Sequence, residues 1–166
     1  MNRVLVAGVG NVFFGDDGFG PAGVRALASD PPAGATVKDF GIRGMHLAYE
    51  LLDGYERAIL IDAAPRGEAP GTLFLMELDP QERGGTPDAH SMDLLNVFAF
   101  MRVLGGSAPQ MTLVGCEPGA TDEEMGLSEA VERAIEPALT VVRRLVDESL
   151  AAPPRRQGEE IAWSEV

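Results

Sequence analysis

Two adjacent carboxylates lie in a glycine-rich stretch near the start of the chain. The stretch reads GVGNVFFGDDGFG over residues 8–20 and carries Asp16 and Asp17. A hydrophobic run at 4–8 enters it and is typical of a buried strand. One aspartate before a helix commonly satisfies free N–H groups. Two in succession, flanked by glycines that let the backbone bend, favour a cation site or an acid/base site instead.

Asp62 and His90 are the other residues that fit a cation site. Asp62 ends the apolar run at 57–62, and His90 lies near the expected start of a helix. Ligands of an open α/β sheet bind beyond the carboxyl ends of its strands, so we expect Asp17 and Asp62 at one edge. Two carboxylates and an imidazole suit a divalent metal such as Ni²⁺ or Zn²⁺. Spacing alone leaves open that Asp62 forms a turn and that His90 is solvated.

Arg43 and His46 follow the second expected strand and are candidates for substrate binding. Arg43 is expected at the same edge as the aspartates, where its guanidinium suits a substrate carboxylate. His46 and Glu50 are one helical turn apart and form either a surface pair or part of the cleft wall. Cys116 ends a strand and is expected to be a small buried hydrophobe.

A nucleotide-binding motif is the alternative explanation of the glycines. Residues 18–23 match G-x-G-x-x-G, and Asp39 is spaced to act as the ribose-binding acid. The match begins well after the first strand, however, whereas the fingerprint follows its strand directly. Asp16 and Asp17 would also repel a pyrophosphate at a helix N-terminus. Dinucleotide binding is therefore disfavoured, and no cofactor-binding residue is assigned.

The elements that position these residues alternate between strand and helix, which indicates an α/β fold with a largely parallel sheet. The connection between the strands 57–62 and 71–78 is too short for a helical crossover, so one strand is expected to be antiparallel. We predict one three-layer α/β/α domain over residues 1–150 with a twisted sheet of about five strands. The tail at 151–166 is expected to be poorly ordered. The expected strands are 4–8, 35–40, 57–62, 71–78 and 110–116, and the expected helices begin near 21, 44, 90 and 128.

The composition excludes several classes of partner. The chain has 166 residues and a net charge of −13, from 13 basic and 26 acidic side chains. Such a balance argues against nucleic acid, whose binding depends on Lys and Arg. No window approaches the apolar length that a membrane span needs. One cysteine fits a reducing compartment, so a cytoplasmic location is expected.

Several of these segments resemble the hydrogenase maturation proteases. The resembling segments span roughly residues 3–146 and read LVAGVGNVFFGDDGFGPAGVRAL, AILIDAAPRGEAPGTL, AHSMDLLNVF, LVGCEPG and GLSEAVERAIEPAL. The resemblance implies an endopeptidase of aspartyl type. Its implied reaction is removal of a C-terminal peptide from the nickel-loaded precursor of a nickel–iron hydrogenase large subunit.

The resemblance also implies roles for particular residues. Asp17, Asp62 and His90 correspond to the family's catalytic and metal-contacting positions. The metal is expected to be nickel supplied by the substrate, with zinc or cadmium as substitutes in vitro. Asp16 is expected to shape the turn or to support Asp17, and it is kept with Arg43 and His46 among the candidate substrate-binding residues.

Two questions stay open at this level. The peptide bond breaks either through a metal that polarises the carbonyl or activates water, or through a carboxylate acting as general base. The alternative function is a non-catalytic metal-binding chaperone that binds the hydrogenase large subunit without shortening it.

Overall fold

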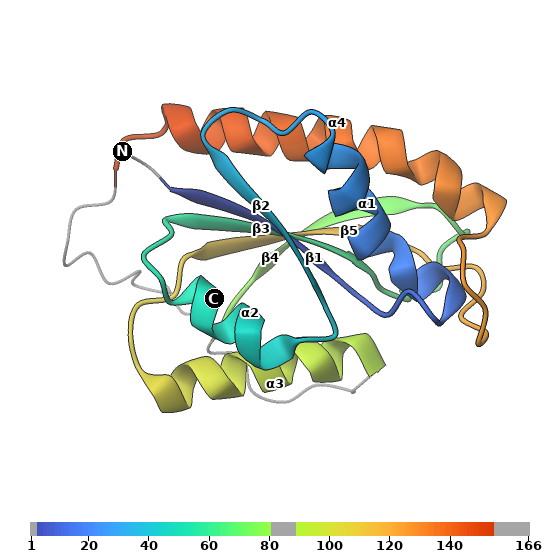
Figure 1. Cartoon of the computed structure of the whole chain (residues 1–166), viewed down its shortest axis with the longest axis horizontal. Coiled ribbons are helices and arrows are strands. Elements are labelled where there is room, and N and C mark those ends of the chain that lie inside the picture. Colours follow the sequence, from blue (N-terminus) through green and yellow to red (C-terminus); the bar gives the residue numbers. More distant parts are fainter. Residues whose placement is uncertain (1–2, 81–88, 155–166) are drawn as a thin grey trace.

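A mostly parallel sheet forms the centre of the protein (Figure 1). The computed structural model describes residues 3–80 and 89–154, apart from the side chains of 89–93. Within these residues five strands pair in the order β2-β1-β3-β5-β4. The strands are β1 (Val4–Val9), β2 (Ala35–Gly41), β3 (Arg57–Ala63), β4 (Leu73–Leu78) and β5 (Gln110–Cys116). Only the β4–β5 pair among them is antiparallel, which confirms the predicted antiparallel strand.

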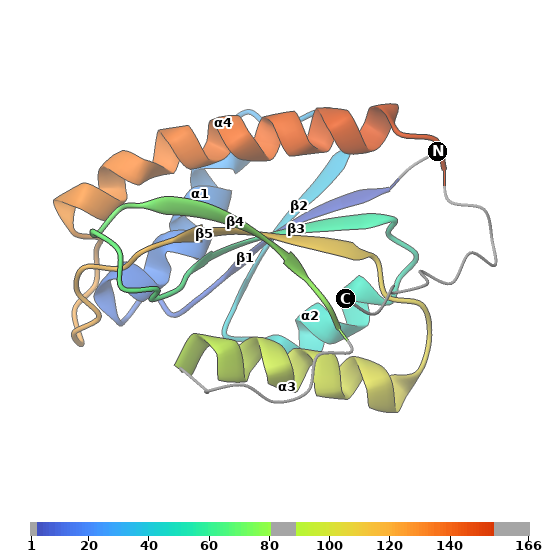
Figure 2. The same cartoon turned by 180° about the vertical axis from the view of Figure 1, so that it is seen from behind.

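Helices cover both faces of the sheet, as the three-layer prediction requires. They are α1 (Phe19–Ala28), α2 (Gly44–Leu51), α3 (Ala89–Leu104) and α4 (Glu129–Ala151). α1 and α4 lie on one face, and α2 and α3 lie on the other (Figures 1 and 2). The chain leaves β1 through α1 to reach β2 and then returns past β1 to β3 through α2. Because parallel crossovers are right-handed, these opposite directions place α1 and α2 on opposite faces.

Alternate residues of the strands supply the two halves of the core. Val4 and Val6 of β1 pack in the cluster with α1 and α4, whereas Leu5 and Ala7 pack in the cluster with α2 and α3. A parallel strand covered on both faces needs apolar residues at successive positions. This need explains the continuous hydrophobic runs that identified β1 and β3 in the sequence.

The glycines that resemble a nucleotide motif include one, Gly20, that serves helix packing. They lie in and just before α1, which begins at Phe19, two residues before the start expected at Pro21. A Cβ on Gly20 would stand 2.2 Å from the carbonyl oxygens of both Val9 and Ile61. Glycine therefore allows α1 to lie directly against β1 and β3.

The approach to α1 contains an element that sequence analysis missed. Asp16 and Asp17 lie in a short 3-10 helix, η1 (Gly15–Gly18), instead of an irregular bend. At the other end of the chain, α4 ends at Ala151, and residues 155–166 of the predicted tail lie outside the described residues. No helix within 3–80 and 89–154 is both long and apolar enough to cross a membrane.

Candidate active site

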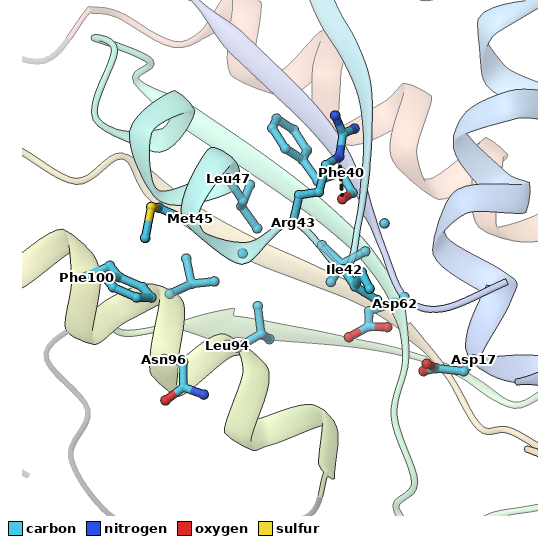
Figure 3. A pocket seen from close by; sticks show the side chains of 15 residues that line it. Asp17, Phe40, Ile42, Arg43, Met45, Leu47, Asp62, Leu94, Asn96 and Phe100 are labelled. Atoms are coloured by element: carbon cyan, nitrogen blue, oxygen red, sulfur yellow. Dashed lines mark hydrogen bonds between the residues drawn. The ribbon is translucent and has the colours of Figure 1, made fainter. Parts of the chain in front are cut away.

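A cavity of about 350 Å³ opens at the carboxyl ends of β1 and β3 (Figure 3). These two strands are neighbours in the sheet, and the chain order reverses direction between them. Crevices at such switch points are the usual ligand sites of open α/β sheets. Asp17 and Asp62 both line this cavity, as their positions after β1 and in β3 predicted.

Asp62 is fixed by the sheet. It is the next-to-last residue of β3, its side chain is 3% exposed, and its backbone pairs in register with Gly115 of β5. Asp17 is half-buried in η1, and its Oδ2 accepts a hydrogen bond from the N–H of Asn11 at 3.0 Å. Figure 3 shows the two aspartates together at one end of the cavity. The cavity therefore has an acidic end held by β3 and η1.

His90 lies in the first turn of α3. Its side chain is outside the described part of the structure, so its predicted contact with the aspartates stays a prediction. The helical repeat places position 90 one turn before Leu94, which lines the cavity. Among the side chains that are described, no group of three or more His, Cys, Asp or Glu is placed to hold a metal.

The rest of the cavity wall is largely apolar. β2, α2, α3 and the turn between β2 and α2 supply most of these side chains, and Met45 and Phe100 lie at the end opposite the aspartates in Figure 3. Three of the residues are well exposed: Ile42 at 74%, Met45 at 50% and Phe100 at 41%. Sequence analysis did not identify these residues as part of the site. The apolar lining comprises Val9, Phe40, Ile42, Met45, Leu47, Leu94, Val97 and Phe100.

Asp16 does not contact the cavity. Its side chain is 0% exposed, and its two oxygens accept hydrogen bonds from the N–H groups of Gly119, Ala120 and Ser128 and from the hydroxyl of Ser128. Burial acts to raise the pKa of Asp16, but these hydrogen bonds outweigh it and hold the pKa below its usual range. The expectation that Asp16 binds substrate is therefore corrected: the chain's own donors surround this carboxylate.

Arg43 and His46 differ in their relation to the cavity. Arg43 lines it, and its guanidinium donates to the carbonyl oxygens of Asp39 and Phe40, the latter at 3.2 Å. His46 is exposed and lines a second hollow between β2 and α2, which shares Phe40 and Arg43 with the cavity but contains neither Asp17 nor Asp62. The expected role of His46 in substrate binding stays a prediction.

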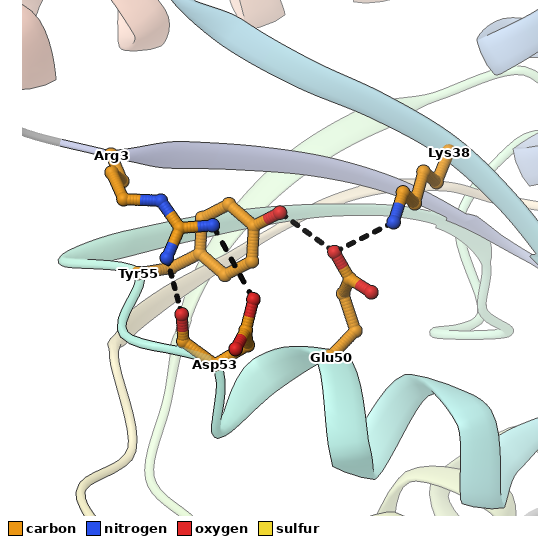
Figure 4. Close-up of polar contacts among 5 residues, drawn as sticks. All are labelled: Arg3, Lys38, Glu50, Asp53 and Tyr55. Carbon is orange, nitrogen blue, oxygen red and sulfur yellow. Dashed lines mark hydrogen bonds and ion pairs between the residues drawn. The ribbon is translucent and has the colours of Figure 1, made fainter.

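Glu50 belongs to a polar network that joins α2 to the sheet (Figure 4). Its Oε1 accepts hydrogen bonds from Nζ of Lys38 at 2.9 Å and from the hydroxyl of Tyr55 at 2.7 Å. The same two bonds lower the pKa of Glu50. Arg3 stacks on the Tyr55 ring and pairs with Asp53. Glu50 therefore anchors α2 to β2 and does not pair with His46, one of the two arrangements that sequence analysis left open.

Cys116 is the buried hydrophobe that was predicted. It is 0% exposed in the core, and burial raises the pKa of its thiol to about 11. A thiol that stays protonated is a poor nucleophile. Cys116 is therefore not a candidate nucleophile.

The fold and the paired carboxylates together define an α/β protein with an acidic cleft beyond the ends of its parallel strands. Comparison with known proteins shows to which family this chain belongs. Residues 24–145 match the family model described as hydrogenase maturation protease. The hydrogenase 2 maturation protease of Escherichia coli K12 is 33% identical, over 92% of this chain and 96% of the relative.

Solved structures agree with this match. The hydrogenase maturating endopeptidase HybD from Escherichia coli superposes with a TM-score of 0.77 at 32% identity, covering 89% of this chain and 93% of that one. The [NiFe] hydrogenase maturation protease HybD from Thermococcus kodakarensis gives 0.72 at 25% identity, covering 86% and 98%. This chain belongs to the hydrogenase maturation protease family and is a peptidase.

Proposed function

We propose that this peptidase removes the C-terminal peptide from the nickel-loaded precursor of a nickel–iron hydrogenase large subunit. One observation carries the proposal: Asp17 and Asp62, far apart in sequence, line one cavity at the ends of adjacent parallel strands. The names of the relatives support the choice of substrate. The protein from Thermococcus kodakarensis is described as a [NiFe] hydrogenase maturation protease.

In this proposal the metal is part of the substrate. Nickel already seated in the precursor contacts Asp17, Asp62 and His90, a donor set of two carboxylates and one imidazole that suits Ni²⁺. Zinc or cadmium is expected to occupy the same donors in vitro. Because the metal completes the contact between the two proteins, loaded precursor is cleaved and unloaded precursor is spared.

The chemistry is hydrolysis of one peptide bond. The oxygen of a water bonds to the carbonyl carbon, the C–N bond breaks, and the leaving amine takes up a proton. One route has the metal polarise the carbonyl or activate the water. The other has Asp17 or Asp62 accept the proton of the attacking water. The site offers carboxylates for both routes.

The apolar end of the cavity binds the substrate's side chains. Ile42, Met45 and Phe100 are exposed in the free protein although each is large and hydrophobic. Covering such side chains contributes favourable free energy in proportion to the apolar area removed from water. We infer that an apolar side chain near the cleaved bond enters this end while the metal lies at the aspartates.

The proposed setting is the cytoplasm. The single cysteine, Cys116, is a buried free thiol. A chain without a disulfide framework fits a reducing compartment.

The decisive experiment is the intact mass of a large-subunit precursor incubated with this protein, with and without nickel loading. Loss of a C-terminal peptide only from the loaded form is the expected result. Binding without a change of mass would favour the chaperone alternative. Cleavage irrespective of nickel would refute the metal gate while leaving the peptidase activity intact.

A further inference from the structure

We propose that Asp16 is a positioning residue: it fastens η1 to the segment 119–128 and thereby fixes the carboxylate of Asp17 at the cavity. The inference concerns the geometry of the site and rests on the proposed function only for its catalytic consequence. Two observations support it, the hydrogen bonds that the Asp16 side chain accepts and the backbone contacts that accompany them.

The Asp16 carboxylate accepts hydrogen bonds from both ends of the loop between β5 and α4. Oδ2 accepts the N–H groups of Gly119 at 2.7 Å and Ala120 at 2.8 Å, and also the hydroxyl of Ser128 at 2.8 Å. Oδ1 accepts the N–H of Ser128 at 2.6 Å. Bonds of this kind to an ionised acceptor are roughly twice as strong as those between neutral groups. One side chain thus closes the loop that joins β5 to α4.

The backbone of η1 is joined to the same loop. The N–H of Gly15 donates to the carbonyl of Glu124 at 2.6 Å, and the N–H of Asp16 donates to that of Ala120 at 2.7 Å. Gly15 has a φ of +54°, and a Cβ there would stand 2.5 Å from the oxygen of Ala120. The close approach of η1 to the segment 119–128 therefore requires glycine at position 15. The backbone contact, like the side-chain contacts, depends on the residue type at its position.

Ser128 shows that the contact with Asp16 prevails over ordinary helix capping. It occupies the N-cap position of α4, but its side chain makes no capping hydrogen bond. A serine that caps contributes about 1 kcal/mol to helix stability. Here the hydroxyl donates to Asp16 instead. The helix thus begins where it was expected, near 128, without a side-chain cap from Ser128.

Asp17 depends on this attachment because η1 has only four residues. So short a helix has little stability of its own. The N–H of Asp17 donates to the carbonyl of Phe14, and its Oδ2 accepts the N–H of Asn11 at 3.0 Å. The preceding residue, Asp16, anchors the turn from the opposite side. Loosening that anchor therefore frees Asp17 to leave the position in which it lines the cavity.

The test compares Ser128→Ala and Asp16→Asn with the control Ser149→Ala. Ser149 is a buried serine of the same helix, and its hydroxyl donates to the carbonyl of Leu145 at 2.6 Å. Ser128→Ala removes one of the four bonds to Asp16 and leaves the carboxylate. Asp16→Asn is the harsher change, because either orientation of the amide turns its NH₂ group toward an N–H donor. Circular dichroism establishes that each variant is folded.

The first readout does not require catalysis. The amide proton of Asn11 reports the position of the Asp17 carboxylate, to which it is bonded. Its chemical shift and its exchange with solvent are measured by nuclear magnetic resonance. We expect a changed shift and several-fold faster exchange in Ser128→Ala and no change in Ser149→Ala. An Asn11 amide that is unaltered in folded Ser128→Ala and folded Asp16→Asn would overturn the inference.

The second readout is cleavage of the nickel-loaded precursor. Loss of a residue that orients a metal-contacting side chain typically lowers activity by roughly 10- to 100-fold. We expect that fall in kcat for both variants, with KM close to that of the unaltered protein. If the Asn11 amide is altered in these variants but their kcat is normal, the position of Asp17 does not limit cleavage and the catalytic consequence is refuted. A wild-type chain that cleaves nothing would refute the proposed function, and the Asn11 amide would still decide the positioning role.

Discussion

Asp17, in η1 after β1, and Asp62, in β3, line one cavity, because β1 and β3 run parallel and pair Gly8 with Ile61 at their carboxyl ends. Neither carboxylate comes from a compact sequence motif. The parallel pairing brings the ends of β1 and β3 together, and η1 then holds Asp17 at the cavity, so either side chain can be changed without altering the backbone pairing of a strand. Substitution of either aspartate can therefore test its role in cleavage without unfolding the protein.

Asp62→Asn and Asp17→Asn should abolish processing while leaving the fold intact. Asparagine has nearly the same shape but carries no charge for a cation. Because residues that merely orient such ligands cost about 10- to 100-fold, direct loss should cost on the order of a hundredfold or more. The measurement is the rate of mass loss of the loaded precursor. Asp53→Asn, at an exposed acid paired with Arg3, is the control. Activity in both test variants equal to that of the control would reject this metal site.

His90→Ala extends the same test to α3. If His90 completes the set of metal contacts, its loss should lower the rate as much as loss of Asp62 does. The measurement is again precursor cleavage, repeated with zinc and cadmium in place of nickel. A His90→Ala variant with undiminished rates would reduce the site to its two carboxylates.

The same feature of the sequence, its apolar runs, predicted both the strands of the sheet and the location of the aspartates at its edge. Apolar runs mark β1 and β3, and a polar residue that ends such a run must lie at the sheet edge. A supporting role for Asp16 was expected, but its partners were not predictable, because they are mainly backbone N–H groups of residues 119–128. Ile42 was missed because an apolar residue in the short turn between β2 and α2 belongs to no periodic pattern.

Ile42→Ser should raise KM for the loaded precursor by roughly tenfold with little change in kcat. Burying an aliphatic side chain contributes about 1.5–3 kcal/mol, most of which serine cannot supply. Ile42 is 74% exposed, so the substitution should leave stability nearly unchanged. Val103→Ser is the matched control, since Val103 is 84% exposed and does not line the cavity. Equal KM values for the two variants would contradict the proposed apolar subsite.

Glu50 should stabilise the protein only above acidic pH. Hydrogen bonds from Lys38 and Tyr55 hold its pKa below the usual value of 4.5. A carboxyl whose pKa is depressed by folding stabilises above its unfolded pKa, and this contribution is lost as the pH falls through the folded one. Lys38 is half-exposed, so solvent screening limits the contribution to about 1 kcal/mol.

Urea unfolding of Glu50→Gln at pH 7 and at pH 3 measures this contribution. The difference in unfolding free energy between the wild type and the variant should be present at pH 7 and should shrink as the pH falls below 4.5. Glu148→Gln is the control, because Glu148 is 60% exposed and pairs with Arg144 at 3.7 Å. A difference for Glu50→Gln that does not vary with pH would show that its charge contributes nothing.

Gly20→Ala and Gly23→Ala should have opposite effects although both lie in α1. A Cβ at Gly20 would meet the backbone oxygens of Val9 and Ile61 at 2.2 Å, so α1 must move off the sheet at a cost of about 2 kcal/mol or more. A Cβ at Gly23 would meet only the Ile61 side chain, at 3.4 Å. Alanine there should stabilise the helix by up to ~1 kcal/mol. Urea unfolding measures both changes. Equal stability of the two variants would mean that α1 can leave the sheet without loss, which contradicts its close packing at Gly20.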